Sequence, residues 1–257
     1  MVQNQVPDTN ALSRLSTEDL KQKLIDLAQP HEGDSLSQKR KFYESTLQPF
    51  FETLAQRNPT QNVKDQSDLV IGVWKPIWST IPFQDVLPGR RLDQSYQIFR
   101  NDGYYANIAR YAPGTDLPIL RNLSFNPIVY DLMLVQKYEI REEEWLIENV
   151  SIKQRLKLAA SQLTLETAKN WFEQVMAAPL KEVKSSGEMN VKLPFSKKAN
   201  QRASKQLQGA ARAKPKLEHL YIDRDFRLVK SQRESKQRPS YTITVRADID
   251  FCFLTNP

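Results

Sequence analysis

Hydrophobic residues recur every three or four positions through the first sixty residues, which is the spacing of one face of a helix. The first such stripe is Leu20, Leu24 and Leu27. It follows Ser16-Thr17-Glu18-Asp19, an N-cap sequence with acidic residues in the first turn. A second stripe comprises Tyr43, Leu47, Phe50, Phe51 and Leu54 and ends before Asn58-Pro59. We therefore predict an N-terminal helical segment over residues 1–62.

Beyond Asp68 the hydrophobic period shortens to two, which is typical of strands. Runs over 96–99 and 104–111 flank Asn101-Asp102-Gly103, a strong hairpin signal. Further alternating runs cover 128–134, 150–158, 189–195 and 241–253. In the last run the odd positions are apolar and the even ones polar, so a slip of one residue would invert every side chain. One helix, 164–178, interrupts the strands between its cap Thr164 and Pro179.

Alternating strands, hairpin turns and the lack of a βαβ rhythm predict a mainly β protein with accessory helices. We expect the strands to close into an antiparallel barrel over residues 66–257, behind the N-terminal helices. A barrel of about eight strands is wide enough to hold one small ligand.

The composition excludes several kinds of chemistry. The chain has 257 residues, of which 40% are hydrophobic and 26% charged, so it is long enough to bury a core. One Cys and two His allow neither an internal disulfide nor a Cys/His zinc site. None of the seven glycines lies within four residues of another, which excludes the glycine-rich nucleotide loops. We therefore predict no metal, no cofactor and no catalytic residues.

The net charge of +7 is concentrated in one segment, residues 196–216, which holds seven basic and no acidic residues. They are Lys197, Lys198, Arg202, Lys205, Arg212, Lys214 and Lys216. Because the segment has almost nothing to bury, we expect a mobile loop. Such a loop suits an anionic membrane surface. Nucleic-acid binding is an alternative, but the segment has no aromatic residue to stack on bases.

Neither a membrane-spanning run nor a targeting segment is visible. No apolar run approaches the roughly 18 residues that cross a bilayer. Residues 1–15 show neither a secretory apolar region nor the composition of a transit peptide. We expect the protein to work in the compartment in which it is made.

Three motifs carry a family resemblance. The first is Leu54 to Thr60, in which the helical stripe ends in Asn-Pro. The second is Val70 to Thr80, which contains Gly72-Val73-Trp74, the G-x-W signature of a first lipocalin-type strand. The third is Tyr221-Ile222-Asp223-Arg224-Asp225-Phe226-Arg227-Leu228. In this order and spacing, over roughly Tyr43 to Val245, they resemble the plastid-lipid-associated (PAP/fibrillin) family of plastids and cyanobacteria.

The chain departs from the family pattern at several positions. Val70 stands where the family has Leu, Trp78 replaces a Tyr, and Val229 follows Leu228 where the family usually has Arg-Gly. Pro76 lies within the first strand, where it loses a ladder hydrogen bond unless it is at an edge or a bulge. The resemblance is therefore to a divergent member of cyanobacterial type.

The resemblance implies a lipocalin-like barrel and a non-catalytic role in binding or carrying an apolar or lipid-like molecule. Such a ligand would be a quinone, carotenoid, fatty acid or pigment. It further implies a setting at photosynthetic membranes, on the cytoplasmic side of a thylakoid or in the plastid stroma. An alternative is a barrel enzyme like the bilin chromophore lyases, which hold a tetrapyrrole.

Candidate ligand contacts come from the aromatic residues of the predicted strands and from the third motif. The aromatic candidates are Trp74, Trp78, Tyr96, Phe99, Tyr105 and Tyr130. Each is also a plausible core residue. Asp223 and Arg227 are candidates to pair or to orient a polar head group, with a surface ion pair as the alternative. His219 and Asp223, four apart on a predicted strand, should be too far apart to act together.

Overall fold

The computed structural model describes residues 9–82, 89–112, 128–158, 160–178, 214–232 and 237–247. The predicted strand at 189–195 and the end of the last predicted strand lie outside these ranges. So does the predicted basic loop, apart from Lys214, Lys216 and the proline between them.

The helical elements are α1 (Thr9–Ser13), α2 (Thr17–Ala28), η1 (Gln29–His31), α3 (Leu36–Phe42), η2 (Tyr43–Leu47), α4 (Gln48–Gln56), α5 (Val63–Val70) and α6 (Leu165–Met176). The strands are β1 (Gly72–Ser79), β2 (Arg90–Phe99), β3 (Tyr104–Tyr111), β4 (Ile128–Arg141), β5 (Glu144–Leu158), β6 (Lys216–Ile222), β7 (Phe226–Gln232) and β8 (Ser240–Arg246). Both predicted caps are confirmed, since the Ser16 side chain accepts from the Asp19 amide and Thr164 from the Thr167 amide.

The strands follow one another from β1 to β8 and close into an antiparallel barrel. The predicted fold class is therefore confirmed. The hairpin at Asn101-Asp102-Gly103 is also confirmed, since β2 and β3 pair through Phe99 and Tyr105. Gly103 has a φ of +82° there, a conformation that glycine adopts without strain.

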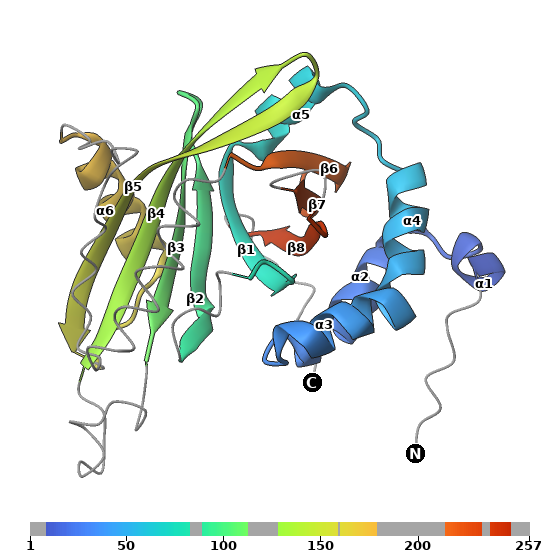
Figure 1. The fold of residues 1–257 in the computed structure, drawn as a ribbon, viewed down its shortest axis with the longest axis horizontal. Coiled ribbons are helices and arrows are strands. Elements are labelled where there is room, and N and C mark those ends of the chain that lie inside the picture. Colours follow the sequence, from blue (N-terminus) through green and yellow to red (C-terminus); the bar gives the residue numbers. More distant parts are fainter. Residues whose placement is uncertain are drawn as a thin grey trace, which may run out of the picture. The chain divides into compact units, whose positions relative to one another are not determined.

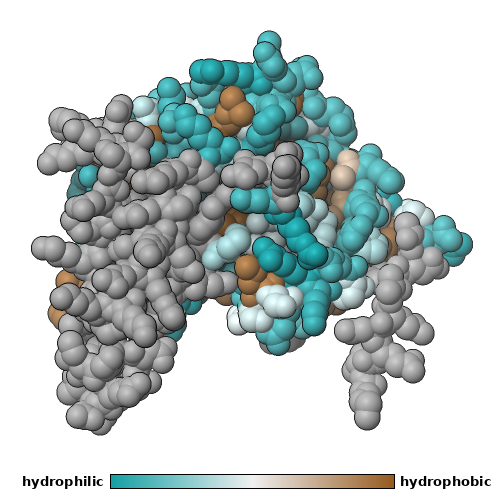
Figure 2. Space-filling model, viewed as in Figure 1, coloured by the Kyte–Doolittle hydropathy of each residue, from teal (hydrophilic) through white to brown (hydrophobic). Residues whose placement is uncertain are grey.

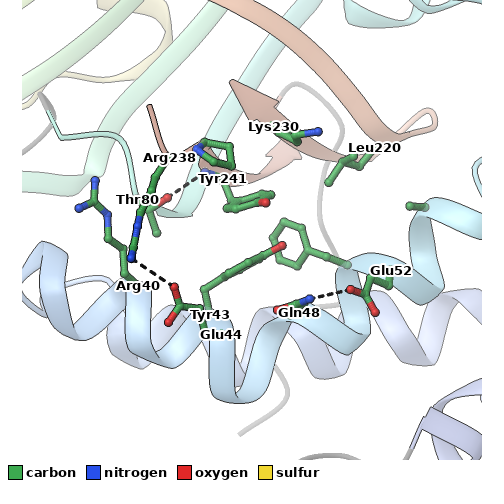
Figure 3. Close-up of a pocket in the computed structure, with 13 residues that line it drawn as sticks. Arg40, Tyr43, Glu44, Gln48, Glu52, Thr80, Leu220, Lys230, Arg238 and Tyr241 are labelled. Carbon is green, nitrogen blue, oxygen red and sulfur yellow. Dashed lines mark hydrogen bonds and ion pairs between the residues drawn. The ribbon is translucent and has the colours of Figure 1, made fainter. Parts of the chain in front are cut away.

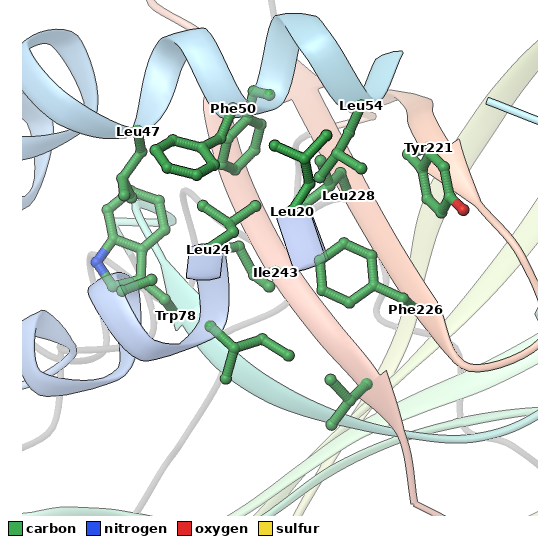
Figure 4. Packing of buried hydrophobic residues seen from close by; sticks show 14 of the residues in the cluster. Leu20, Leu24, Leu47, Phe50, Leu54, Trp78, Tyr221, Phe226, Leu228 and Ile243 are labelled. Atoms are coloured by element: carbon green, nitrogen blue, oxygen red, sulfur yellow. The ribbon is translucent and has the colours of Figure 1, made fainter. Parts of the chain in front are cut away.

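The described chain forms two compact units. Unit 1 contains Met1–Ile81, Ile140–Trp145 and Lys216–Pro257, and unit 2 contains Pro82–Glu139 and Leu146–Pro215. In unit 1, helices α2 and α4 pack on one face of β1, β7 and β8 (Figure 1). Leucines of the helices interdigitate with Phe226, Leu228 and Ile243 of the strands, forming one apolar core (Figure 4). We call this helix-covered side the outer face.

A bulge in β1 changes which side chains share a face. Pro76 pairs with Thr244, whereas Trp78 pairs with Ile243, so the register shifts by one residue between them. Trp74 and Trp78, four residues apart, therefore point to opposite faces. Pro76 stands at the irregularity, where the loss of its ladder hydrogen bond costs least.

In unit 2, β2, β3 and β4 pair in order and α6 packs beside β2. The loop before α6 is tied to the sheet, because the Tyr96 hydroxyl donates to the Leu163 carbonyl (3.3 Å) and the Gln94 side chain accepts from the Leu163 amide (2.8 Å). Ile108 and Met133 are buried on the same face as Tyr96. The other face carries a separate set of aromatic rings.

Some elements were not predicted. Helix α5 continues helical structure past residue 62, and the five residues of η2 form a π-helix inside the second predicted helix. Strand β5 contains the predicted run 150–158, but Leu156 and Leu158 are 64% and 68% exposed. The described part of the surface is mainly hydrophilic in the view of Figure 2, with scattered hydrophobic patches. No helix among the described residues is long and apolar enough to span a bilayer.

Candidate functional site

The face of β1, β7 and β8 opposite to α2 and α4 is buried although it is largely polar. We call it the inner face. It carries Trp74, Arg227, Thr242, Thr244 and Arg246. Because buried polar groups are costly unless they are hydrogen-bonded, the partners of each side chain show how this face is built.

Two guanidinium groups lie close to the Trp74 ring. The Cζ atoms of Arg246 and Arg227 lie 4.1 Å and 4.8 Å from its ring centroid, within cation–π distance. The indole Nε1 donates to the Val70 carbonyl at 2.8 Å. The ring is therefore held by a hydrogen bond at its edge and by two neighbouring cations.

The two arginines differ in their partners. Arg246 donates to backbone carbonyls of Arg224 (2.9 Å), Leu69 (2.5 Å) and Ile71, and thereby ties β8 to the segment before β1. Arg227 donates from Nε to the Thr244 hydroxyl at 3.2 Å. Arg246 therefore has a structural role, and Arg227 is a second buried cation of the inner face, beside Trp74.

His219 adds a neutral hydrogen-bonding group to this face. Gln66 Oε1 accepts from Trp145 Nε1 (3.2 Å), while its Nε2 donates to the Thr60 carbonyl (3.0 Å). Since Gln66 Oε1 is an acceptor, His219 Nδ1, which lies 3.2 Å from it, carries the proton. Nε2 is thus an acceptor, and it has no hydrogen-bond partner among the described residues.

Burial keeps the His219 imidazole uncharged. The residue is 6% exposed. Desolvation, and next the positive charge of Arg227, hold its pKa well below the ordinary value. His219 and Trp145 pack edge to face at 4.9 Å. The inner face therefore offers a hydrogen-bond acceptor beside a cation and aromatic rings.

Asp223 does not pair with Arg227, contrary to one of the roles considered for it. It lies in the β6–β7 turn, where it accepts from the backbone amides of Asp225 (3.0 Å) and Phe226 (2.8 Å) and forms an ion pair with Lys21 of α2. Lys21 also contacts Asp225 at 3.2 Å. These contacts join the first long helix to the sheet on the outer side, whereas Arg227 points to the inner face.

His219 and Asp223 are separated by a further irregularity. The register of β6 against β7 shifts between His219 and Tyr221, so His219 faces inward with Val229 while Tyr221 lies in the outer core. Asp223 follows the end of the strand, in the turn held by Lys21. The two residues therefore lie apart, as the sequence predicts, but because of the irregularity and the turn rather than their spacing along a regular strand.

Trp78 lies in the outer core beside Leu24, Leu47 and Ile243, because the β1 bulge turns it away from Trp74 (Figure 4). In unit 2, Phe99 stacks on Tyr105 with ring centroids 4.4 Å apart, and Tyr130 stacks on Tyr111 at 5.3 Å. Directly opposed residues of antiparallel strands share a face. Phe99, Tyr105 and Tyr130 therefore share one face of this sheet, and Tyr96 lies on the opposite one.

Sequence reasoning missed several members of these faces. Tyr111 and Tyr138 belong to the aromatic face of unit 2. Tyr105 and Tyr111 are an even number of residues apart on one predicted strand, so the sequence already indicated that they share a face. His219, Arg246 and Trp145 gave no such signal, because their contacts come from strands far apart in the chain.

Two of the predicted membrane-surface residues are described, and both form ion pairs. Lys214 contacts Glu148 at 3.1 Å and Lys216 contacts Glu144 at 2.6 Å. Lys216 is the first residue of β6. Lys197, Lys198, Arg202, Lys205 and Arg212 lie outside the described residues. Among the described residues there is no group of three or more His, Cys, Asp or Glu placed to hold a metal ion.

Comparison with known proteins yields one family. The sequence model described as PAP_fibrillin matches residues 18–236, which is most of the chain. The match begins before Tyr43, where the resemblance seen in the sequence began, and so includes helix α2. No curated protein matches the chain.

Proposed function

Since the chain belongs to the PAP/fibrillin family, we propose that it binds and carries an apolar or lipid-like small molecule at photosynthetic membranes, without catalysis. The ligand class is a quinone, carotenoid, fatty acid or pigment. An eight-stranded antiparallel barrel suits this role, because a barrel of that size can hold one small ligand.

The observation that best supports the proposal is the inner face around Trp74. A ligand site is typically apolar or aromatic with a few placed polar groups that fix orientation. Trp74 provides a rigid ring, and Arg227 provides a guanidinium beside it. His219 Nε2 is a buried acceptor for a ligand hydroxyl. A ligand with an apolar body and an oxygen-bearing head would use all three groups.

Tryptophan fluorescence tests this proposal. Titration with an uncharged, short-tailed quinone should change the emission saturably and raise the melting temperature, because a ligand that binds only the folded state stabilises it. Trp74→Phe should remove most of the emission change. Trp171→Phe, which alters a tryptophan of α6 in the other unit, should retain it. If neither emission nor melting temperature of the unaltered protein responds, the binding proposal fails and a scaffold role replaces it.

The membrane part of the proposal has separate support. Leu156 and Leu158 are exposed and alternate with Lys157 at the end of β5. Exposed leucines insert among acyl chains, while each lysine near an anionic bilayer contributes about 1 kcal/mol. We propose that this strand end and the basic segment 196–216 together attach the protein to the membrane surface, on the cytoplasmic side of a thylakoid or in the stroma.

A further inference from the structure

A groove lies on the outer side of unit 1, away from the inner face. It is bounded by α3, η2 and α4 on one side and by Thr80 and strands β6 to β8 on the other (Figure 3). Its volume is about 440 Å³, within the range of small-molecule sites. Every lining residue belongs to unit 1.

Aromatic rings form the floor of the groove. Tyr43 of η2 stacks on Tyr241 of β8, with ring centroids 4.0 Å apart and an interplanar angle of 15°. Phe51 meets both rings edge to face, at 5.2 Å and 5.7 Å. Burial, then a hydrogen bond with Tyr241 and the nearby charge of Glu52, raises the pKa of the Tyr43 hydroxyl. The floor is therefore aromatic, and the Tyr43 hydroxyl within it stays protonated.

Tyr43 is the first residue of the π-helix η2 and lines the groove. The Gln48 amide donates to the Tyr43 carbonyl five residues earlier, so this turn contains one residue more than an α-helical turn. Tyr43 lines the groove and packs against the edge of the outer core, in which Leu47 is buried. Single π-turns are rare in helices and occur frequently at functional sites.

The charges of the lining favour an anion at one end of the groove. Arg40 lines the groove and has no ion pair among the described residues. Glu44, four residues later, pairs with Arg238 at 3.5 Å, and both side chains are exposed, so this pair is weak. Arg40 and Arg238 thus belong to the same end (Figure 3). Glu52, which accepts from Gln48 at 2.7 Å, lies at the other end (Figure 3).

From these observations we propose that the groove binds a small amphiphilic carboxylate. Its apolar body packs against Tyr43, Tyr241 and Phe51, and its carboxylate lies at Arg40 and Arg238. A guanidinium recognises a carboxylate through two parallel hydrogen bonds, which a neutral head group does not match. This site is separate from the inner face around Trp74 and does not depend on the function proposed for it.

Isothermal titration of the full chain with 2-naphthoate and with decanoate tests the proposal and distinguishes an aromatic from an acyl body. At least one should bind saturably, and its neutral analogue, 2-naphthamide or decanol, should bind about tenfold more weakly. Arg40→Gln should weaken carboxylate binding by a similar factor. Lys41→Gln, which removes a neighbouring exposed cation outside the groove, should leave it unchanged. Raising the salt concentration should weaken binding, since the cations are partly exposed.

The outcomes separate this site from the inner face. Trp74→Phe should leave carboxylate affinity unchanged, and Arg40→Gln should leave the fluorescence response to an uncharged quinone unchanged. Equal binding of the carboxylate and its neutral analogue would overturn the proposal. So would equal affinities of the Arg40→Gln and Lys41→Gln proteins for the carboxylate, with both proteins retaining the unaltered circular dichroism spectrum. Absence of heat with both carboxylates, with confirmation by equilibrium dialysis, would also overturn it.

Discussion

The two faces of β8 are buried to the same extent but differ in chemistry. Ile243 on the outer face and Thr244 on the inner face both have 0% of their surface exposed. Ile243 packs among the leucines of α2 and α4, whereas Thr244 accepts a hydrogen bond from Arg227. One strand therefore separates an apolar core from a polar, aromatic surface that is also protected from water.

Under the proposed function, this difference places stability and ligand recognition on opposite sides of the same sheet. Burying an aliphatic side chain contributes about 1.5–3 kcal/mol. A net protein hydrogen bond contributes only about 0.5–1.5 kcal/mol, because the unfolded chain bonds to water instead. The outer face should therefore carry most of the folding free energy, and the inner face should determine what binds.

The largest effect is expected from a cavity on the outer face. Ile243→Ala removes a fully buried aliphatic group between α2, α4 and the sheet, so it should lower the free energy of unfolding by about 2–5 kcal/mol. Urea unfolding measures this loss. Quinone affinity per folded molecule should remain unchanged, and a parallel loss of affinity would show that the two faces are not independent.

A smaller effect is expected where the first long helix is tied to the sheet. Lys21→Met leaves Asp223 and Asp225 without their cation. Because Asp225 is half exposed, the free energy of unfolding should fall by about 1–3 kcal/mol, less than for a fully buried pair. Lys23→Met, on the exposed side of the same helix, should change stability little. Urea unfolding again provides the measurement.

The contribution of Asp223 to the pH dependence of stability follows from its own pKa shift. Burial raises the pKa of Asp223, but hydrogen bonds from Asp225, Lys21 and Tyr221 outweigh it, so the net pKa is lowered. A lowered acid pKa gives stability that is present above the unfolded pKa and is lost as the pH falls through the folded one. Asp223→Asn should therefore destabilise the protein at pH 7 and leave quinone affinity unchanged. Weakened quinone binding with unchanged stability would restore a ligand role to Asp223.

The sequence was sufficient to predict the helices with side-chain caps, the β2–β3 hairpin and the barrel class, because those signals are local. Ser16, Thr164 and Gly103 each act within a few residues of their own position. The π-helix was missed because one inserted residue hardly changes the apolar stripe of Tyr43 to Leu54. Helix α5 was missed because few of its residues are apolar.

The candidate site was predicted less well because alternation identifies two faces without showing what covers either. In β8 both faces are buried, so polarity did not indicate exposure. The bulge after Pro76 places Trp78 on the face opposite to Trp74. The irregularity before Tyr221 places His219 and Tyr221 on opposite faces. Such shifts depend on the partner strand, which a single sequence does not reveal.

His219 provides a pH-dependent test of the inner face. Its pKa in the folded protein lies well below 6.5, while the unfolded chain takes up a proton near that pH. The unfolded state therefore binds more protons as the pH falls below about 6.5, and stability should decrease by roughly 1.4 kcal/mol per pH unit. His219→Gln should remove this slope between pH 6.5 and 5. His31→Gln, which changes the half-exposed histidine before α3, should retain it.

The smallest effect on folding is expected at the exposed end of β5. Replacing Leu156 and Leu158 with Ser should change the free energy of unfolding by less than about 0.5 kcal/mol, because neither side chain is buried. The same change should reduce sedimentation with anionic vesicles, since it removes the apolar groups that enter the bilayer. Leu27→Ser, at another partly exposed leucine, is the matched control.

Changing the seven basic residues of 196–216 to Gln should also reduce sedimentation, and this contribution should diminish as salt screens the charges. Weak RNA binding from charge alone would be consistent with this view. Sequence-selective RNA binding at physiological salt would contradict it, as would vesicle binding that neither set of changes affects.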